Sequence, residues 1–434
     1  MAKYEQYAEY KDSGVEWLGA IPSHWEAKRL GQFFNERREK VSDKDYAALS
    51  VTMKGIVPQL ENAAKSDAGD NRKLVLKNDF VINSRSDRKG SSGVSLLNGS
   101  VSLISIVLEP RNISPKFVHH LLRSYPFQEE FYRHGKGIVA DLWSTNSSEM
   151  KNILIPTIPI DEQNQIASFL DHETAQIDTL IEKQKTLIEL LKEKRQAVIS
   201  HAVAKGLNPD APMKDSGVEW VETIPEHWKA YKLGYCASVG NGATPSRDNL
   251  NFWKDGSISW LNSSKINDVI IHEADQFITP LAKLKTSVHP VQKNDILMAI
   301  TGEGQTRGRV AICKLDATIN QHLACIRITN EELGYEYLYY WLNSNYERIR
   351  FESSGAGSTK GAITCGNITS YPVLIPPKKE QQEIVEYLKE KNEIFDTLMN
   401  SAEQAIQLMQ ERRTALISAA VTGKIDVRGW VKPS

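Results

Sequence analysis

A long stretch without proline or glycine, residues 161–205, constrains the fold of this 434-residue chain more than any other segment. Apolar residues recur along it every seven positions, which is typical of a helix that buries one stripe against a partner helix. A second stretch, 380–421, has the same character, and the two stretches end at Gly206 and Gly423. At ~1.5 Å rise per residue each gives a rod of about 65 Å, so the simplest partner for one rod is the other.

The expected seam between the rods consists of apolar residues seven positions apart, together with apolar residues three places further on. It comprises Leu170, Ile177, Leu180, Leu187, Leu191 and Val198 in the first stretch and Leu388, Phe395, Leu398, Met409 and Leu416 in the second. Polar residues interrupt both seams. Such breaks favour a fixed register between two unequal helices, or docking of a partner protein, over free self-assembly.

An internal repeat divides the chain into two similar halves. Residues 11–31 read KDSGVEWLGAIPSHWEAKRLG and residues 214–234 read KDSGVEWVETIPEHWKAYKLG, and we call each the His-Trp box. Weaker matches follow, such as Lys-Asn-Asp before an apolar run at 77–79 and at 293–295. The chain therefore consists of two copies of one plan: a His-Trp box, a globular domain and a rod.

Short apolar runs bounded by Gly, Asn, Asp and Ser predict strands in each globular part. The expected elements are strands at 74–76, 80–83 and 101–108 with a helix near 115–123, and strands at 258–261, 296–300, 310–313 and 323–328 with a helix near 335–343. We therefore expect an α+β fold in which two globular α+β domains are separated by two long antiparallel helices that form a coiled coil, with a pseudo-twofold internal duplication. The expected segments are a first globular domain with its box at 1–157, a long helix at 158–206, a linker at 207–213, a second globular domain at 214–373, a second long helix at 374–425 and a tail at 426–434.

The sequence lacks the residue patterns that an enzyme of this size should carry. The glycine-rich segment 302–308 has neither the Lys nor the strand-to-helix context of a phosphate-binding loop. Asp79 and 87–89 come nearest to a metal-dependent nuclease, but the basic residues suit phosphates better than catalysis. His24 and His227 recur beside a tryptophan, and we interpret them as structural. We expect no catalytic residue, metal or cofactor in this chain.

Polar loops after matched strands give the clearest signal of binding. The two copies diverge after their Lys-Asn-Asp strands into 84–93 and 301–309, which are rich in Arg, Gln, Ser and Gly. Arg suits guanine and Gln suits adenine in the major groove of DNA, while Gly and Ser let the backbone approach phosphates. Residues 72–90 hold six Lys or Arg against two Asp, a cluster that the net charge of −1 conceals.

These loops and a second pair of glycine-containing loops predict a DNA-binding surface in each copy. The expected DNA-binding residues are Arg72, Lys73, Arg85, Ser86, Arg88, Lys89, Ser91 and Lys136 in the first copy and Ser263, Lys265, Gln305, Thr306, Arg307, Arg309, Ser358 and Lys360 in the second. For any single loop the alternative is a solvated turn without a ligand.

The chain resembles a known family, the specificity subunits of Type I restriction-modification systems. The resemblance rests on the repeated His-Trp box, on Pro-x-x-Glu-Gln at 159–163 and 377–381, and on the C-terminal segment 416–425. The second domain also carries Gly-Ala-Thr-Pro at 242–245, which is similar to a common opening of the family's target-recognition domains. The first domain has SVTMKGI at 50–56 instead, so we expect its target class to differ.

The resemblance implies two target-recognition domains that each read one half of a split double-stranded DNA sequence, held apart by the two helices. The helices would also bind two modification subunits, which carry S-adenosylmethionine and methylate adenine. Restriction subunits that use ATP and Mg would join them to translocate and cut. The chain would be the non-catalytic reader in the cytoplasm, away from any membrane, and four cysteines without metal-ligand spacing fit that setting. The alternative is a scaffold that only bridges partner proteins.

Overall fold

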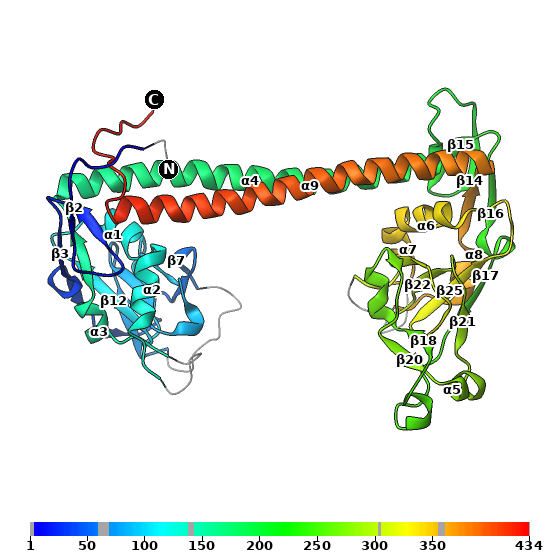
Figure 1. Cartoon of the computed structure of the whole chain (residues 1–434), viewed down its shortest axis with the longest axis horizontal. Coiled ribbons are helices and arrows are strands. Elements are labelled where there is room, and N and C mark those ends of the chain that lie inside the picture. Colours follow the sequence, from blue (N-terminus) through cyan, green and yellow to red (C-terminus); the bar gives the residue numbers. More distant parts are fainter. Residues whose placement is uncertain (1–3, 60–68, 138–142, 303–304, 355–360, 434) are drawn as a thin grey trace. The chain divides into compact units, whose positions relative to one another are not determined.

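The computed structural model describes residues 4–59, 69–137, 143–302, 305–354 and 361–433. The chain divides into two compact units: unit 1 comprises Met1–Thr186 with Ala402–Ser434, and unit 2 comprises Leu187–Ser401. Each unit contains one globular α+β part and one half of each long helix (Figure 1). The predicted α+β fold class is therefore confirmed. The long helices do not form a separate unit, because one half of each belongs with each globular part.

The two long helices begin and end close to where the sequence predicts. Helix α4 spans Ile160–Lys205 and helix α9 spans Lys378–Val421. The glycines that follow them, Gly206 and Gly423, have φ of 76° and 72°. This left-handed conformation ends a helix, and glycine adopts it without penalty because it has no Cβ atom. Both predicted terminators are therefore confirmed.

The buried stripe of the helices differs from the predicted seam in one of its two rows. The first predicted row is buried or half-buried at Leu170, Ile177, Leu191, Val198, Leu388, Phe395, Met409 and Leu416. The second row lies four residues after the first, through Ile181 and Ile188 at 6% and 7% exposure. Leu180, Leu187 and Leu398 were wrongly placed in the seam, since they are 49%, 43% and 47% exposed. In a heptad stripe, steps of three and four residues alternate. From the first row the buried stripe continues with a step of four, so a residue three places further on lies at the edge of the stripe.

The same ion pair between α4 and α9 occurs once within each unit. In unit 1, Arg413 Nε of α9 lies 2.8 Å from Asp178 Oδ1 of α4. In unit 2, Arg195 of α4 pairs with Asp396 of α9. Asp396 stands in α9 where Asp178 stands in α4, and Arg413 stands where Arg195 stands, so the two pairs are one contact duplicated. The C-terminal end of α4 lies against the N-terminal end of α9 in unit 2, which makes the pair antiparallel there.

Unit 1 is built on two small antiparallel sheets, with strand orders β10-β9-β12-β4 and β11-β8-β5. Their strands are β4 (Phe34–Glu36), β5 (Lys40–Val41), β8 (Arg72–Val75), β9 (Phe80–Asn83), β10 (Ser92–Val94), β11 (Gly99–Val101) and β12 (Ser105–Pro110). The remaining elements are β1 (Tyr10–Asp12), β2 (Ala20–Pro22), β3 (Glu26–Arg29), β6 (Leu49–Thr52), β7 (Gly55–Pro58), α1 (Pro115–Leu121), α2 (Tyr125–Arg133), α3 (Ser147–Asn152) and β13 (Leu154–Thr157). One apolar core joins the His-Trp box, the sheet, α1, α2 and the adjoining halves of α4 and α9.

Unit 2 has a five-stranded sheet of order β17-β25-β22-β23-β19 and a four-stranded sheet of order β20-β18-β24-β21. Their strands are β17 (Ala237–Asn241), β18 (Ile258–Leu261), β19 (Ile270–Ile271), β20 (Gln276–Ile278), β21 (His289–Val291), β22 (Ile296–Ala299), β23 (Val310–Cys313), β24 (Ala317–Ile319) and β25 (Leu323–Ile328). The remaining elements are β14 (Met213–Val218), β15 (Val221–Pro225), β16 (Lys229–Lys232), α5 (Pro280–Lys285), α6 (Tyr335–Ser344), α7 (Tyr346–Glu352), α8 (Cys365–Ser370) and β26 (Pro372–Ile375).

The duplication extends through the sheets of both units. The order β10-β9-β12-β4 in unit 1 matches β23-β22-β25-β17 in unit 2, and β11-β8 matches β24-β21. The repeated Lys-Asn-Asp turn has the same backbone in both, with φ of 76° at Asn78 and 77° at Asn294. Asp79 and Asp295 then accept the backbone N–H three residues earlier at 2.8 Å and 2.7 Å. The turn is therefore architectural, and it aligns the loops that follow it.

One predicted strand is wrong in a way that matters for the site. Residues 101–108 form the end of β11 and the start of β12, which belong to different sheets. A turn at 102–104 separates them, closed by a 3.0 Å hydrogen bond from the Ser105 N–H to the Ser102 carbonyl. The apolar run hides this turn, because Leu103 and Ile104 are as apolar as the strand residues around them.

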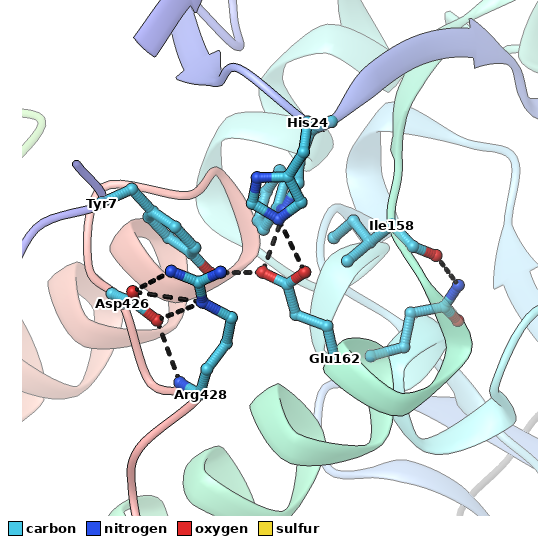
Figure 2. Close-up of polar contacts among 8 residues, drawn as sticks. Tyr7, His24, Ile158, Glu162, Asp426 and Arg428 are labelled. Carbon is cyan, nitrogen blue, oxygen red and sulfur yellow. Dashed lines mark hydrogen bonds and ion pairs between the residues drawn. The ribbon is translucent and has the colours of Figure 1, made fainter. Parts of the chain in front are cut away.

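In unit 1 a glutamate at the start of α4 holds the His-Trp box. Glu162 accepts hydrogen bonds from the Tyr7 hydroxyl at 2.7 Å and from Trp25 Nε1 at 3.0 Å. His24 Nε2 lies 2.9 Å from the other carboxylate oxygen (Figure 2). Burial and the bond to Glu162 raise the pKa of Tyr7. The interpretation of His24 as a structural residue beside a buried tryptophan is confirmed.

Unit 2 repeats this arrangement without the tyrosine. Glu380, at the start of α9, accepts from Trp228 Nε1 at 3.1 Å and contacts His227 Nε2 at 2.7 Å. The glutamine that follows each glutamate, Gln163 or Gln381, accepts a backbone N–H of the globular part at 2.8 Å. The Glu-Gln pair of the repeated motif therefore fastens each long helix to both the box and the globular part.

The C-terminal tail completes the box of unit 1. The Asp426 N–H donates to the Glu5 carbonyl at 2.8 Å. Arg428 pairs with Asp426 at 2.6 Å and its guanidinium lies 4.9 Å from the centre of the Tyr7 ring. Figure 2 shows these side chains gathered around Tyr7 and Glu162. Residues from the two ends of the described chain therefore form one cluster around Tyr7 and Glu162.

Candidate nucleic-acid interface

In unit 1 the loop after β9 carries three exposed basic side chains. Its backbone is fixed, because the Arg85 N–H donates to Asn83 Oδ1 at 3.1 Å and the Ser86 N–H donates to the Trp143 carbonyl at 2.9 Å. Arg85, Arg88 and Lys89 are exposed on this base, and Lys89 forms an ion pair with a glutamate of α2. The loop therefore presents positive charge from a rigid backbone, as predicted contacts to DNA require.

A cleft of about 440 Å³ lies beside Arg85. Arg85 and Lys73 line it together with the carboxylate Glu36, hydroxyl and amide groups of 144–147, and the turn residues at 103–104. Burial alone would raise the pKa of Glu36, but hydrogen bonds from Arg38, Ser147 and Lys151 outweigh it and lower the pKa to about 2. The cleft thus combines fixed donors, acceptors and one permanent negative charge, a combination that suits the edges of bases.

Two residues predicted to bind DNA in unit 1 are buried instead. Arg72 is 8% exposed, and its guanidinium donates to Ser100 Oγ at 2.9 Å and to the Ser100 carbonyl at 3.0 Å. Ser91 is 6% exposed. Both predictions are wrong, because both residues are buried, and Ser100, a partner 28 residues away, holds the Arg72 guanidinium inside the unit. Lys73 is half-buried and donates to the Ser105 carbonyl at 2.7 Å, and burial lowers its pKa.

In the matching loop of unit 2, Gln305 is exposed and Arg309 is half-buried. Arg309 donates to Asn267 Oδ1 at 3.1 Å and to Gln305 Oε1 at 3.3 Å, so a predicted adenine reader and a predicted guanine reader lie side by side. Thr306 is half-buried. Arg307 was wrongly predicted to bind DNA, since it is 7% exposed and donates to Ser354 Oγ at 2.7 Å.

The remaining predicted contacts are spread over both units. Ser263 is half-buried, and Lys265 Nζ lies 2.7 Å from Asp275, which raises the pKa of the lysine. Lys136 is exposed and its Nζ lies 2.6 Å from a glutamate of α3. The predicted contacts Ser358 and Lys360 lie outside the described residues.

Two features of unit 2 escaped the sequence analysis. The Arg247 guanidinium lies 3.8 Å from the ring centre of Trp253 and 5.0 Å from that of Trp260. The turn at 320–322 carries an exposed glutamine and a half-buried histidine next to the loop after β22. The Gly-Ala-Thr-Pro segment pointed to this region, but only the fold brings the turn beside it.

Across the parts of the chain that the structure describes, no group of three or more His, Cys, Asp or Glu side chains could hold a metal ion. Within those same parts, no helix is both long and apolar enough to cross a membrane.

Comparisons with known proteins agree with this geometry. The sequence profile of the Type I restriction modification DNA specificity domain matches residues 225–408. The chain is 22% identical over 435 residues to the type I restriction enzyme MjaVIII specificity subunit of Methanocaldococcus jannaschii, covering 94% of each protein. It is 27% identical over 299 residues to the type I restriction enzyme EcoR124I/EcoR124II specificity subunit of Escherichia coli, covering 67% of this chain and 65% of that one. A chain from a solved structure of a type I R-M system shares its fold, with a TM-score of 0.69 at 16% identity over 92% of this chain and 98% of that one.

Proposed function

The chain belongs to the specificity subunits of type I restriction-modification systems, and we propose that its two units each read one half of a split DNA sequence. It is a DNA sequence-recognition subunit, and it is not itself an enzyme. The proposal that each unit reads its own half-site rests on one observation: the two units share a scaffold but present different loops. Strand orders and the Lys-Asn-Asp turn match between the units, whereas the residues presented after β9 and after β22 differ.

Unlike loops on like scaffolds favour an asymmetric site. Exposed basic groups in unit 1, such as Arg85 and Arg88, suit phosphates and guanine. The adjacent amide and guanidinium of Gln305 and Arg309 in unit 2 offer both adenine-type and guanine-type contacts. Phosphate contacts would set affinity and register, and the loops would set sequence. The bases between the two halves would be left unread.

We further propose that the long helices dock the partner subunits. Four large apolar residues are 43% to 55% exposed on the helix halves of unit 2: Leu187, Leu190, Ile394 and Leu398. Exposed apolar residues of this number on one helix pair favour a protein partner. The partners would be two modification subunits that carry S-adenosylmethionine and methylate adenine, joined by restriction subunits that use ATP and Mg. The assembly would act on double-stranded DNA in the cytoplasm.

Variants of the unit 1 loop test the proposal. Replacing Arg85 and Arg88 with Ala should relax or abolish recognition of one half-site and leave the other half-site intact. The readout is methylation of plasmid libraries in which each half-site is varied separately. Loss of preference in both half-sites, or in neither, would contradict the division of labour.

Salt dependence distinguishes a DNA reader from a protein scaffold. The complex with modification subunits should lose DNA affinity steeply between 50 mM and 200 mM salt, by about 10³-fold or more if six or more phosphates are contacted. A scaffold without DNA contacts would show no sequence-specific binding at any salt concentration.

A further inference from the structure

One turn occupies the same place in both units and faces the loop predicted to contact DNA. In unit 1 it is 102–104, between β11 and β12, and in unit 2 it is 320–322, between β24 and β25. Both turns are closed by a hydrogen bond from the first residue of the next strand to the carbonyl of the first turn residue, at 3.0 Å and 3.3 Å. The turns are therefore one element of the duplicated fold that carries different side chains.

In unit 1 this turn presents two apolar side chains to a polar cleft. Leu103 and Ile104 are 38% and 39% exposed. They line the same cleft as Arg85, Ser144 and Asn146. An apolar pair beside an arginine suits the major-groove edge of DNA, where the C5-methyl group of thymine is the apolar feature. The positive charge next to the pair favours DNA over an apolar peptide as the occupant.

In unit 2 the same turn presents a polar network. Gln321 Oε1 accepts from the Thr244 hydroxyl. Gln321 Nε2 lies 3.1 Å from His322 Nε2, and His322 Nδ1 lies 2.7 Å from Thr301 Oγ1. The network is satisfied when His322 Nε2 accepts and Nδ1 donates, a tautomer assigned from these partners.

The network holds the Gln321 amide ready for a ligand. The contacts of Gln321 with Thr244 and His322 use one lone pair of its carbonyl oxygen and one N–H of its amide. One acceptor site and one donor remain. Adenine takes this pair from glutamine, through its N6 amino group and its N7 atom.

A glycine fixes the segment after β17 that supplies Thr244. A Cβ atom at Gly242 would collide with the Ile319 carbonyl of β24. The Ala243 N–H then donates to the same carbonyl at 3.0 Å. The Gly-Ala-Thr-Pro segment therefore passes directly over the end of β24. Because only glycine fits against the Ile319 carbonyl, the segment lies close enough for its threonine to reach the turn.

We propose that this turn is a second base-reading element in each unit. Leu103 and Ile104 contact thymine methyl groups in one half-site, and Gln321, positioned by His322, contacts an adenine in the other. The inference rests on the proposed function, because base contacts require that both units bind DNA. The loops predicted from the sequence supply phosphate and guanine contacts beside this turn.

The test for unit 2 uses the complex of the full chain with its modification subunits and a randomised double-stranded DNA library. Sequencing the bound DNA gives the base preference at every position. Gln321→Ala should lower the preference for adenine at one position by about 5- to 150-fold and leave the other half-site unchanged. Asn208→Ala removes an exposed amide from the linker after α4 and should leave both half-sites unchanged.

The test for unit 1 replaces thymine with uracil in the selected site, which removes only the C5-methyl group. The wild-type complex should lose about fourfold in affinity at the position read by the turn. The double variant Leu103→Ser with Ile104→Ser should not respond to the replacement. Both side chains are exposed, so the variant should fold, and circular dichroism checks that it does.

The outcomes separate this inference from the function on which it rests. If both variants keep every base preference and the uracil response of the wild type, the turn does not read bases, although the chain still reads DNA. If the wild-type complex shows no base preference, the proposed function fails and the inference fails with it.

Discussion

Removing Glu162 should loosen the His-Trp box of unit 1 more than the same change loosens the box of unit 2. Glu162 is 7% exposed and accepts from two buried donors, the Tyr7 hydroxyl and Trp25 Nε1. Glu380 accepts from one buried donor, Trp228 Nε1. A buried donor without an acceptor costs about 1–3 kcal/mol. Glu162→Ala should therefore cost about 2–6 kcal/mol locally, and Glu380→Ala about 1–3 kcal/mol.

Hydrogen–deuterium exchange with peptide-level mass spectrometry measures these local free energies separately. Peptides from 18–30 report on the box of unit 1, and peptides from 221–233 report on the box of unit 2. Glu26→Ala provides the control, because Glu26 is an exposed residue of the same box whose ion pair with Lys28 lies on the surface. It should leave protection of the box close to that of the wild type, because an ion pair on the surface contributes little.

Equal loss of protection in the two boxes would refute this reasoning. So would a Glu162 variant that behaves like the Glu26 control, because the bonds to Tyr7 and Trp25 would then contribute nothing. Glu162→Gln should lie between wild type and Glu162→Ala, since its carbonyl oxygen can still accept from both donors.

Three further predictions concern the helices and their surroundings. Exchanging the charges of Asp178 and Arg413 should restore most of the roughly 0.2–1 kcal/mol that either single reversal removes, as a double-mutant cycle in urea would show. Burial and the neighbouring Arg123 lower the pKa of His119 to about 3, so the unfolded chain binds a proton there that the folded chain does not. Stability should therefore fall by about 2 kcal/mol between pH 7 and pH 5, and His119→Gln should abolish that loss in urea titrations at the two pH values. Inserting one helical turn of four residues in a long helix, ~6 Å, should lengthen the unread spacer by about two base pairs, and an unchanged spacer in methylation mapping would contradict a ruler role.

The long helices and the duplication could be predicted because their signals are local. A heptad pattern in a stretch without proline or glycine, followed by a terminal glycine, specifies each helix without reference to any partner. The phase of the second row could not be recovered in the same way, because Leu180 and Leu187 fit a step of three as well as Ile181 and Ile188 fit a step of four. Only the packing of the helices shows which leucines face a neighbour.

The candidate site was predictable in its location and less so in its residues. Loops that diverge after matched strands can be read from the sequence, and in those loops Arg85 is exposed and Arg309 is half-buried. Arg72 and Arg307 are buried because Ser100 and Ser354, 28 and 47 residues away, accept their hydrogen bonds. Such partners depend on the fold and leave no local pattern.

The turn at 102–104 was missed for a related reason. Its apolar residues extend an apolar run, so the pattern reads as one strand. In the second copy the equivalent residues are polar, and they interrupt the run visibly. Comparing the strand orders of the two units is what identifies both turns as the same element.

Sequencing of DNA methylation in cells with and without this gene tests the central claim most directly. We expect adenine methylation at one asymmetric motif, made of two specified halves and an unspecified spacer, which disappears when the gene is deleted and returns when it is restored. The same methylated motifs in both strains would contradict the claim that this chain reads the DNA sequence.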